Sequence, residues 1–152
     1  MLLLLALLIG IVAGLRAMTA PAAISWAAHL GWLHLDGSWL AFLGYRFTPW
    51  IFSALALLEL VSDQLPATPS RKTPPQFGTR LVVGALCGAA IGVSGGTWIA
   101  GLVAGVVGAV IGTLGGAALR ARLAAALGSD RPAAWIEDVI AVGGAVLIVL
   151  AL

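Results

Sequence analysis

The chain has 152 residues, of which 61% are hydrophobic and 9% are charged, and its formal net charge is +2. Soluble domains carry charge on about a quarter of their residues, so this composition excludes a water-soluble fold and indicates an integral membrane protein. The cations are few and dispersed, which argues against a nucleic-acid partner. The single cysteine, Cys87, has no second thiol with which to form a disulfide or a metal site, and we expect neither a metal nor a cofactor.

The first predicted span covers residues 2–20. Gly10 and Gly14 lie in it at the GxxxG spacing that lets membrane helices approach closely, and Arg16 lies three quarters of the way along. Pro21 is expected to end or kink this helix. The stretch has no basic n-region of the kind that precedes a cleaved signal peptide, so we interpret it as a retained span.

Residues 22–47 are apolar but carry three tryptophans and a tyrosine. This composition is typical of the membrane interface and predicts an amphipathic or re-entrant helix near one surface. His29 and His34 are interpreted as interfacial polar residues rather than as a metal-binding pair. If residues 22–35 form a span of their own, the number of spans rises from five to six.

The second predicted span, residues 48–66, carries two carboxylates. Thr48 is expected to cap this helix and Pro66 to mark its exit. Glu59 then lies about 15 Å into the helix, near the bilayer midplane, where an ionisable side chain costs at least ~2.5 kcal/mol and normally faces protein or a water-filled cavity. Asp63 follows four residues later, so both carboxylates point to one side.

The third and fourth spans are predicted to follow an exposed polar loop at residues 67–80. The third, 81–93, is short. The fourth, 97–119, carries glycines at 101 and 105 and again at 108, 112 and 116, which give it two faces for close helix contact. A chain of this size is expected to use one face internally, so the other face predicts a homodimer or a larger homo-oligomer.

The last span is predicted at residues 133–152, after a loop at 119–133 in which Asp130 is expected to cap the helix. The two polar loops together hold six lysines and arginines, whereas the opposite side has one, Arg46. The positive-inside rule therefore places both loops and the N-terminus in the cytoplasm and the C-terminus outside.

The sequence also contains a weak internal repeat within what we expect to be one membrane domain, residues 1–152. The halves, 1–66 and 97–152, each contain a glycine-rich helix with an arginine followed by a helix with an acidic residue. The loop 67–80 and the helix 81–93 would join them. With five spans the second half is inverted relative to the first, which is the inverted-topology repeat of many transporters.

Such a repeat would gather six charged side chains around its axis. Intramembrane charges either pair with one another or line a path for an ion or solute, and both interpretations stay open for Glu59 with Arg16. Glu137 and Asp138 could also simply complement a helix N-terminus. The candidate ion- or substrate-binding residues are Arg16, Glu59, Asp63, Arg120, Glu137 and Asp138.

Four short motifs carry a resemblance to a known family. They are Gly14-Leu15-Arg16-Ala17, the acidic motif from Leu58 to Pro66, the basic proline-rich loop that leads to residues 80–85, and Ile136-Glu137-Asp138. Over nearly its whole length the chain resembles the bacterial membrane-protein family catalogued as domain of unknown function 4126. Gln64 stands where a lysine is expected in the acidic motif, so this chain lacks that lysine for a local ion pair. The resemblance implies a small polytopic inner-membrane protein and brings no activity with it.

Three functions are compatible with these features. The first is a transporter or channel for an unidentified ion or small solute, with the carboxylates as a cation or proton site and the arginines as counter-charges. The second is a membrane scaffold that docks other helices, and the third is a lipid-modifying enzyme that uses Glu59 or Asp63 as acid or base. Transport predicts a polar cavity that reaches Glu59 from one side, a scaffold predicts Glu59 sealed against Arg16, and an enzyme predicts a laterally open pocket.

Overall fold

The regular elements of the chain are all helices in the computed structural model, which describes residues 1–65 and 70–152. The elements are α1 (Leu2–Leu15), α2 (Thr19–His29), the short 3-10 helix η1 (Ala41–Gly44), α3 (Thr48–Ser62), α4 (Pro74–Ser94), α5 (Trp98–Leu127) and α6 (Asp130–Leu150). Helices α4, α5 and α6 are long and apolar enough to cross a membrane, and α1 and α3 are shorter apolar helices. The predicted class, an all-helical membrane bundle, is confirmed in this form.

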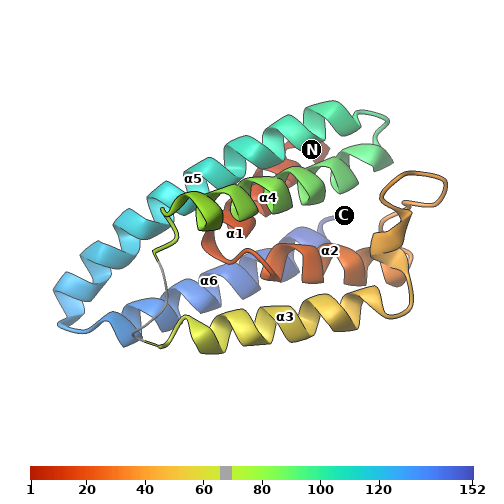
Figure 1. Ribbon diagram of the computed structural model, residues 1–152. Helices are drawn as coiled ribbons and strands as arrows, with labels where there is room; N and C mark the ends of the chain where they lie inside the picture. The colour runs from red at the N-terminus through yellow and green to blue at the C-terminus, as the bar shows by residue number, and fades with distance from the viewer. Residues whose placement is uncertain (66–69) are drawn as a thin grey trace.

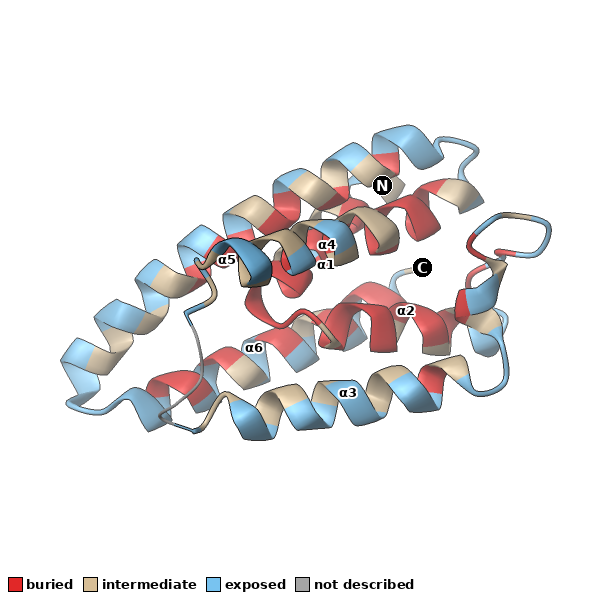
Figure 2. Cartoon of the chain, viewed as in Figure 1, coloured by how far each residue is buried: buried red, intermediate tan, exposed pale blue. Residues whose placement is uncertain are grey.

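The helices form two groups that pack against each other. Helices α1, α4 and α5 pack together in one group, and α2 packs between α3 and α6 in the other (Figure 1). The apolar core draws mainly on α1, α2 and the inner side of α4, where the groups meet, and α5 and α6 each bury one face as well (Figure 2). Fully buried side chains of this core include Ile9, Ile24, Leu40, Cys87 and Ile91. Cys87 is a free thiol and packs in this core as a small buried side chain.

The first predicted span is two helices rather than one. Helix α1 ends at Leu15, Arg16 is extended with φ −139° and ψ 109°, and α2 begins at Thr19 and runs back alongside α3 (Figure 1). Pro21 lies in the first turn of α2, so the expectation that it ends a helix is wrong. A proline is tolerated there because an amide in the first turn has no partner within the helix.

Helix α2 is also not the interfacial helix predicted for residues 22–47. It is largely buried between α1, α3, α4 and α6, which is possible because its residues are small or apolar. The interfacial composition belongs to the segment that follows it, around η1, where Trp32, Trp39, Tyr45 and Phe47 are exposed.

The helices alternate in direction between two ends of the bundle. The terminal end holds Met1, the turn at residues 95–96 and Leu152, and the side chain of Leu2 reaches Gly95 there. The polar end holds residues 70–73 and 128–129 (Figure 1). Met1 and both polar loops therefore lie at opposite ends of the bundle, in contrast to the expected shared side, and the side of the membrane that each end faces stays a prediction. Helices α1 and α2, at about 21 and 16 Å, are each shorter than the ~30 Å hydrocarbon core, so their junction lies inside the bundle.

Both predicted loops are shorter than expected. Helix α4 begins at Pro74, because Thr73 is followed by two prolines that suit the first turn of a helix, and Arg80 becomes a buried helical residue. Helix α5 continues two turns past the predicted end at 119, because its alanine-rich last turns favour helix although they contain arginines. Gly128, at φ 70°, then ends the helix in the left-handed conformation that favours glycine.

Two capping predictions also differ from the structure. Thr48 is the first helical residue of α3 and donates its hydroxyl to the Phe42 carbonyl, and Phe47 takes the capping position. Ser129 precedes α6 at the position expected for Asp130, whose carboxylate binds an arginine instead. Pro66 and residues 67–69 lie outside the described residues.

The two glycine faces of α5 are both used inside the chain. The 101/105 series packs against α4, and the 108/112 series packs against α1. A Cβ atom on Gly105 would overlap the Gly84 carbonyl, and one on Gly112 would overlap the Ile11 carbonyl. The backbones of α1, α4 and α5 are therefore in contact. Close van der Waals packing of this kind holds membrane helices together, because burial from lipid offers no hydrophobic gain. The reason for expecting an oligomer through a free glycine face disappears, and the oligomeric state stays a prediction.

The inverted repeat is not confirmed. It would relate α1, with Arg16, to α5, with Arg120, and would require these helices to run in opposite directions. Gly10 packs against Gly105 and Gly14 packs against Gly112, so α1 and α5 run in the same direction.

Replacing Gly105 by alanine is expected to lower the stability of the isolated protein. The new Cβ would force α4 and α5 apart, and overpacking of this kind costs at least ~1–3 kcal/mol. Gly115→Ala is the matched control on the same helix, because a Cβ there would meet no described atom within 4 Å. Thermal unfolding in detergent measures both variants, and equal melting temperatures for the two would contradict the packing described.

The topology is tested by labelling single cysteines in a Cys87→Ala background. Ser70→Cys and Ser129→Cys lie at the polar end and should react with an impermeant maleimide from the same side of the membrane. Ser94→Cys, at the terminal end, should react from the other side. A shared side for Ser70→Cys and Ser94→Cys would refute the alternating arrangement.

Candidate functional site

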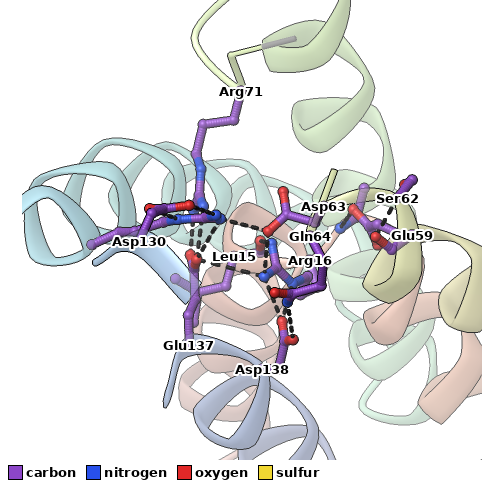
Figure 3. A network of polar contacts seen from close by, with 12 residues as sticks. Leu15, Arg16, Glu59, Ser62, Asp63, Gln64, Arg71, Asp130, Glu137 and Asp138 are labelled. Carbon is purple, nitrogen blue, oxygen red and sulfur yellow. Dashed lines mark hydrogen bonds and ion pairs between the residues drawn. The ribbon is translucent and has the colours of Figure 1, made fainter. Parts of the chain in front are cut away.

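Arg16 lies at the break between α1 and α2 and is fully buried. Its Nε donates to Asp138 Oδ1 at 2.6 Å, and its Nη2 lies 2.7 Å from Asp63 Oδ2 and 3.7 Å from Glu137 Oε2. Figure 3 shows the guanidinium between Asp63 on one side and Asp138 on the other. A buried cation is tolerated only when it is paired and hydrogen-bonded, and these carboxylates from α6 and the end of α3 supply that pairing.

Two further arginines extend the network to the rest of the polar end. Arg120 on α5 pairs with Asp63 and forms two hydrogen bonds with Asp130, at 2.9 and 2.6 Å. Arg71 reaches in from the segment before α4 and binds both oxygens of Glu137, one of them at 2.8 Å (Figure 3). The network thus ties α1, α3, α5 and α6 together with charge-assisted bonds.

Glu59 has a different role from the other carboxylates because it binds the backbone of the break. Its Oε1 accepts from the Ala17 amide and its Oε2 accepts from the Met18 amide, each at 2.8 Å. These amides stand at the N-terminus of α2, where the helix dipole favours a negative charge and the first amides have no partner within the helix. Glu59 therefore caps α2 from a helix more than forty residues away in sequence.

Arg80 serves the other side of the same break. Its Nη1 donates to the Gly14 carbonyl at 2.8 Å, near the C-terminus of α1, and the Thr113 hydroxyl donates to the same oxygen at 3.4 Å. Arg80 Nη2 lies 3.6 Å from Glu59 Oε1. The Arg80–Glu59 pair thus supplies a donor for the free carbonyl at the end of α1 and acceptors for the free amides before α2. Non-helical backbone inside a membrane bundle requires such partners.

The structure brings all six predicted site residues into one region but pairs them differently from the sequence-based expectation. Arg16 binds Asp63 and Asp138 rather than Glu59, whose cationic neighbour is Arg80. Asp138 also accepts from Gln64 at 3.3 Å, so the residue in the lysine position of the family motif still contacts the network.

Three network residues were missed as site residues from the sequence. Arg71 and Arg80 lie in a polar, proline-rich stretch and were counted only as loop cations. Asp130 was assigned to a helix cap. A signal for Arg80 existed, because it directly precedes the apolar run of the third span and would enter the membrane if the helix began one or two turns earlier.

An open cavity of about 770 Å³ leads from the polar end to the break. Ala17, Met18 and Glu59 lie at its inner limit, and the Glu59 side chain is 18% exposed. Beyond the break, the apolar core of α1, α2 and α4 closes the way to the terminal end. The charged residues of its wall are Glu59, Asp63, Arg71, Arg80, Arg120 and Asp130.

A second depression, an apolar groove of about 890 Å³, runs between α3 and α6. Leu57, Val61 and Trp135 are among its lining residues, and Gln64 and Asp138 lie at its polar end. The groove therefore meets the ion-pair network from the side. Among the described residues, no group of three or more histidine, cysteine or acidic side chains is placed to hold a metal ion.

Helices of this length and apolarity, arranged around a buried charged network, define the class: the chain is a helical, polytopic membrane protein. Within that class it belongs to the family described as domain of unknown function (DUF4126), whose family model matches residues 3–151. The resemblance seen in the sequence is thereby confirmed. No curated protein and no solved structure in the comparisons matches the chain.

Replacing Arg16 by glutamine is expected to destabilise the protein strongly. The change leaves Asp63 and Asp138 without their buried partner, and removing one member of a buried ion pair typically costs ~3–5 kcal/mol. Arg122→Gln, on the exposed side of α5, is the control for loss of one positive charge. Thermal unfolding in detergent compares them, and an unchanged melting temperature for Arg16→Gln would show that the network is not needed for stability.

Proposed function

We propose that the protein is a small transporter or channel for an ion or small solute, with Glu59 at the inner end of its path. The single observation that carries this proposal is the cavity that runs from the polar end to Glu59 and stops against the apolar core. A partly polar path that reaches a broken helix from one end of the bundle is what one state of an alternating-access protein needs.

The broken helix supports the same proposal. In many secondary transporters the substrate or ion site is formed where a membrane helix is interrupted, because the free amides and carbonyls of the interruption become ligands. Here the interruption lies at the inner limit of the cavity, and the Ala17 and Met18 amides face Glu59.

Glu59 is the carboxylate best placed to exchange a proton or an ion. It is partly exposed to the cavity, and its bonds depend on its negative charge, because it accepts from two amides and lies beside Arg80. Protonation would weaken these contacts and release the start of α2. The remaining arginines would then act as counter-charges to the other carboxylates.

We further propose that the polar end faces the cytoplasm of a bacterial inner membrane. Five of the eight lysines and arginines lie in or beside the segments at the polar end, Arg16 and Arg80 are buried inside the bundle, and Arg46 lies toward the terminal end. The positive-inside rule counts such cations near membrane boundaries. With the alternating helices, this orientation puts both chain termini outside.

The two other functions fit less well. A scaffold predicts Glu59 sealed against Arg16, whereas Glu59 contacts Arg80, the α2 amides and the cavity. Lipid handling is the second candidate, because the groove between α3 and α6 is apolar along its length and polar where it meets Asp138. That shape suits an acyl chain with its headgroup at the network.

Glu59→Gln is expected to abolish proton-linked flux while the protein still inserts and folds. Glutamine keeps the shape and one acceptor oxygen but cannot carry the charge. Proteoliposomes that contain a pH-sensitive dye measure the flux across a panel of ions, with empty liposomes as the baseline and Asp36→Asn, exposed near the terminal end, as the control.

Two outcomes would overturn the assignment of Glu59. Full flux in Glu59→Gln together with lost flux in Asp63→Asn would move the site one turn toward the polar end. Failure of both Glu59→Gln and Arg80→Gln to fold would show that the pair is purely structural and would favour the scaffold.

A further inference from the structure

The polar atoms around the break are not all satisfied. Among residues 1–65 and 70–152, Arg80 Nε and Thr19 Oγ1 are buried without any hydrogen-bond partner. The Arg80 side chain is 6% exposed and lines the cavity, and Thr19 lies in the first turn of α2. A buried guanidinium with a free donor is costly, because an unpaired buried donor loses its bond to water without replacement.

Glu59 occupies the place of a bound anion. Helix α2 has 11 residues, and the two amides just before it, those of Ala17 and Met18, point at the ligand position as amides do in helix-terminus anion sites. The carboxylate uses its two oxygens on two successive amides, each at 2.8 Å, so the site matches the oxygen spacing of a planar oxyanion. Arg80 flanks the same position at 3.6 Å but donates no hydrogen bond to Glu59 there.

The charge of the cavity would allow a bound anion to replace the Glu59 carboxylate. Its wall carries three carboxylates and three arginines, so removal of the Glu59 charge leaves one net positive charge, next to the positive end of the α2 dipole. A small anion that entered would restore neutrality and could accept from the free Arg80 Nε as well.

We propose that a small monovalent oxyanion of carboxylate size, such as a short monocarboxylate, binds at the start of α2 in place of the Glu59 side chain. Its oxygens accept from the Ala17 and Met18 amides and from Arg80, and Glu59 is the built-in competitor that holds the site when the anion is absent. This inference rests on the proposed function and names the class of its substrate. Entry of the anion together with a proton on Glu59 would move no net charge.

The proposed anion site is tested by removing the Glu59 carboxylate and supplying formate in its place. In Glu59→Ala the two amides lose their acceptor, so the variant should melt at a lower temperature than wild type in detergent. Sodium formate should raise its melting temperature by about 2 °C or more, because a ligand that binds only the folded state stabilises it. Wild type should gain less, since Glu59 already fills the site. Sodium chloride at the same concentration controls for ionic strength.

Two matched variants define where formate acts. Asp36→Ala removes an exposed carboxylate that is not part of the cavity wall, and formate should stabilise it less than it stabilises Glu59→Ala. Adding Arg80→Gln to Glu59→Ala should remove the formate effect. Because Glu59→Ala can fail to fold, Glu59→Gln is measured in parallel and should show a smaller gain.

The proposal is overturned if formate stabilises none of the Glu59 variants that fold, if neither variant folds even when purified in formate, or if Asp36→Ala gains as much as Glu59→Ala. These results are independent of transport. If formate binds but wild-type proteoliposomes show no flux of any ion in the panel, the proposed function is refuted and the anion site is kept. If the proteoliposomes show ion flux but formate does not bind, the anion site alone is refuted.

Discussion

The constraint on which the rest of the structure depends is the hydrogen bonding of three non-helical residues, 16–18, inside a bundle made for a membrane. Lipid supplies no hydrogen bonds in a hydrocarbon core, so the free amides and carbonyls of non-helical backbone there need partners from the protein or from a cavity. Glu59 supplies acceptors for the amides, and Arg80 supplies a donor for the carbonyl of Gly14. Once these two charges are inside, the remaining arginines and carboxylates near them must also be paired, which explains why five of the six acidic residues gather at one end.

Close backbone packing is what makes this capping geometrically possible. Gly14 on α1 touches α5 at Gly112 and Thr113, so its carbonyl lies within reach of both the Thr113 hydroxyl and Arg80. Larger residues at these positions would move α1 away and leave the carbonyl unpaired. The glycines therefore contribute to the site as well as to the fold, because they set how near the broken helix comes to the helices that satisfy it.

The sequence predicted those parts of the structure that depend on local composition. Glu59 and Asp63 were identified because charges are rare in apolar helices, and the glycine faces because their spacing is regular. The break was missed because the side chains that satisfy its backbone groups, Glu59 and Arg80, are distant in sequence. The role of Arg80 was missed because a polar, proline-rich stretch was assigned to a loop, whereas the prolines begin a helix. Pairing among several arginines and carboxylates is likewise a tertiary property that spacing does not determine.

The energetics of the network also bear on whether it is only structural. Replacing buried ion pairs by well-packed apolar side chains is often neutral or stabilising, so a bundle that needed only rigidity would gain little from four arginines and five carboxylates. An uninterrupted first helix would likewise need neither Glu59 nor Arg80. The interruption and its charges have a use if the freed backbone groups serve as ligands at the end of an open path. The position of the break at the inner limit of the cavity, with Arg80 Nε still without a hydrogen-bond partner among the described residues, is the arrangement that such a use requires.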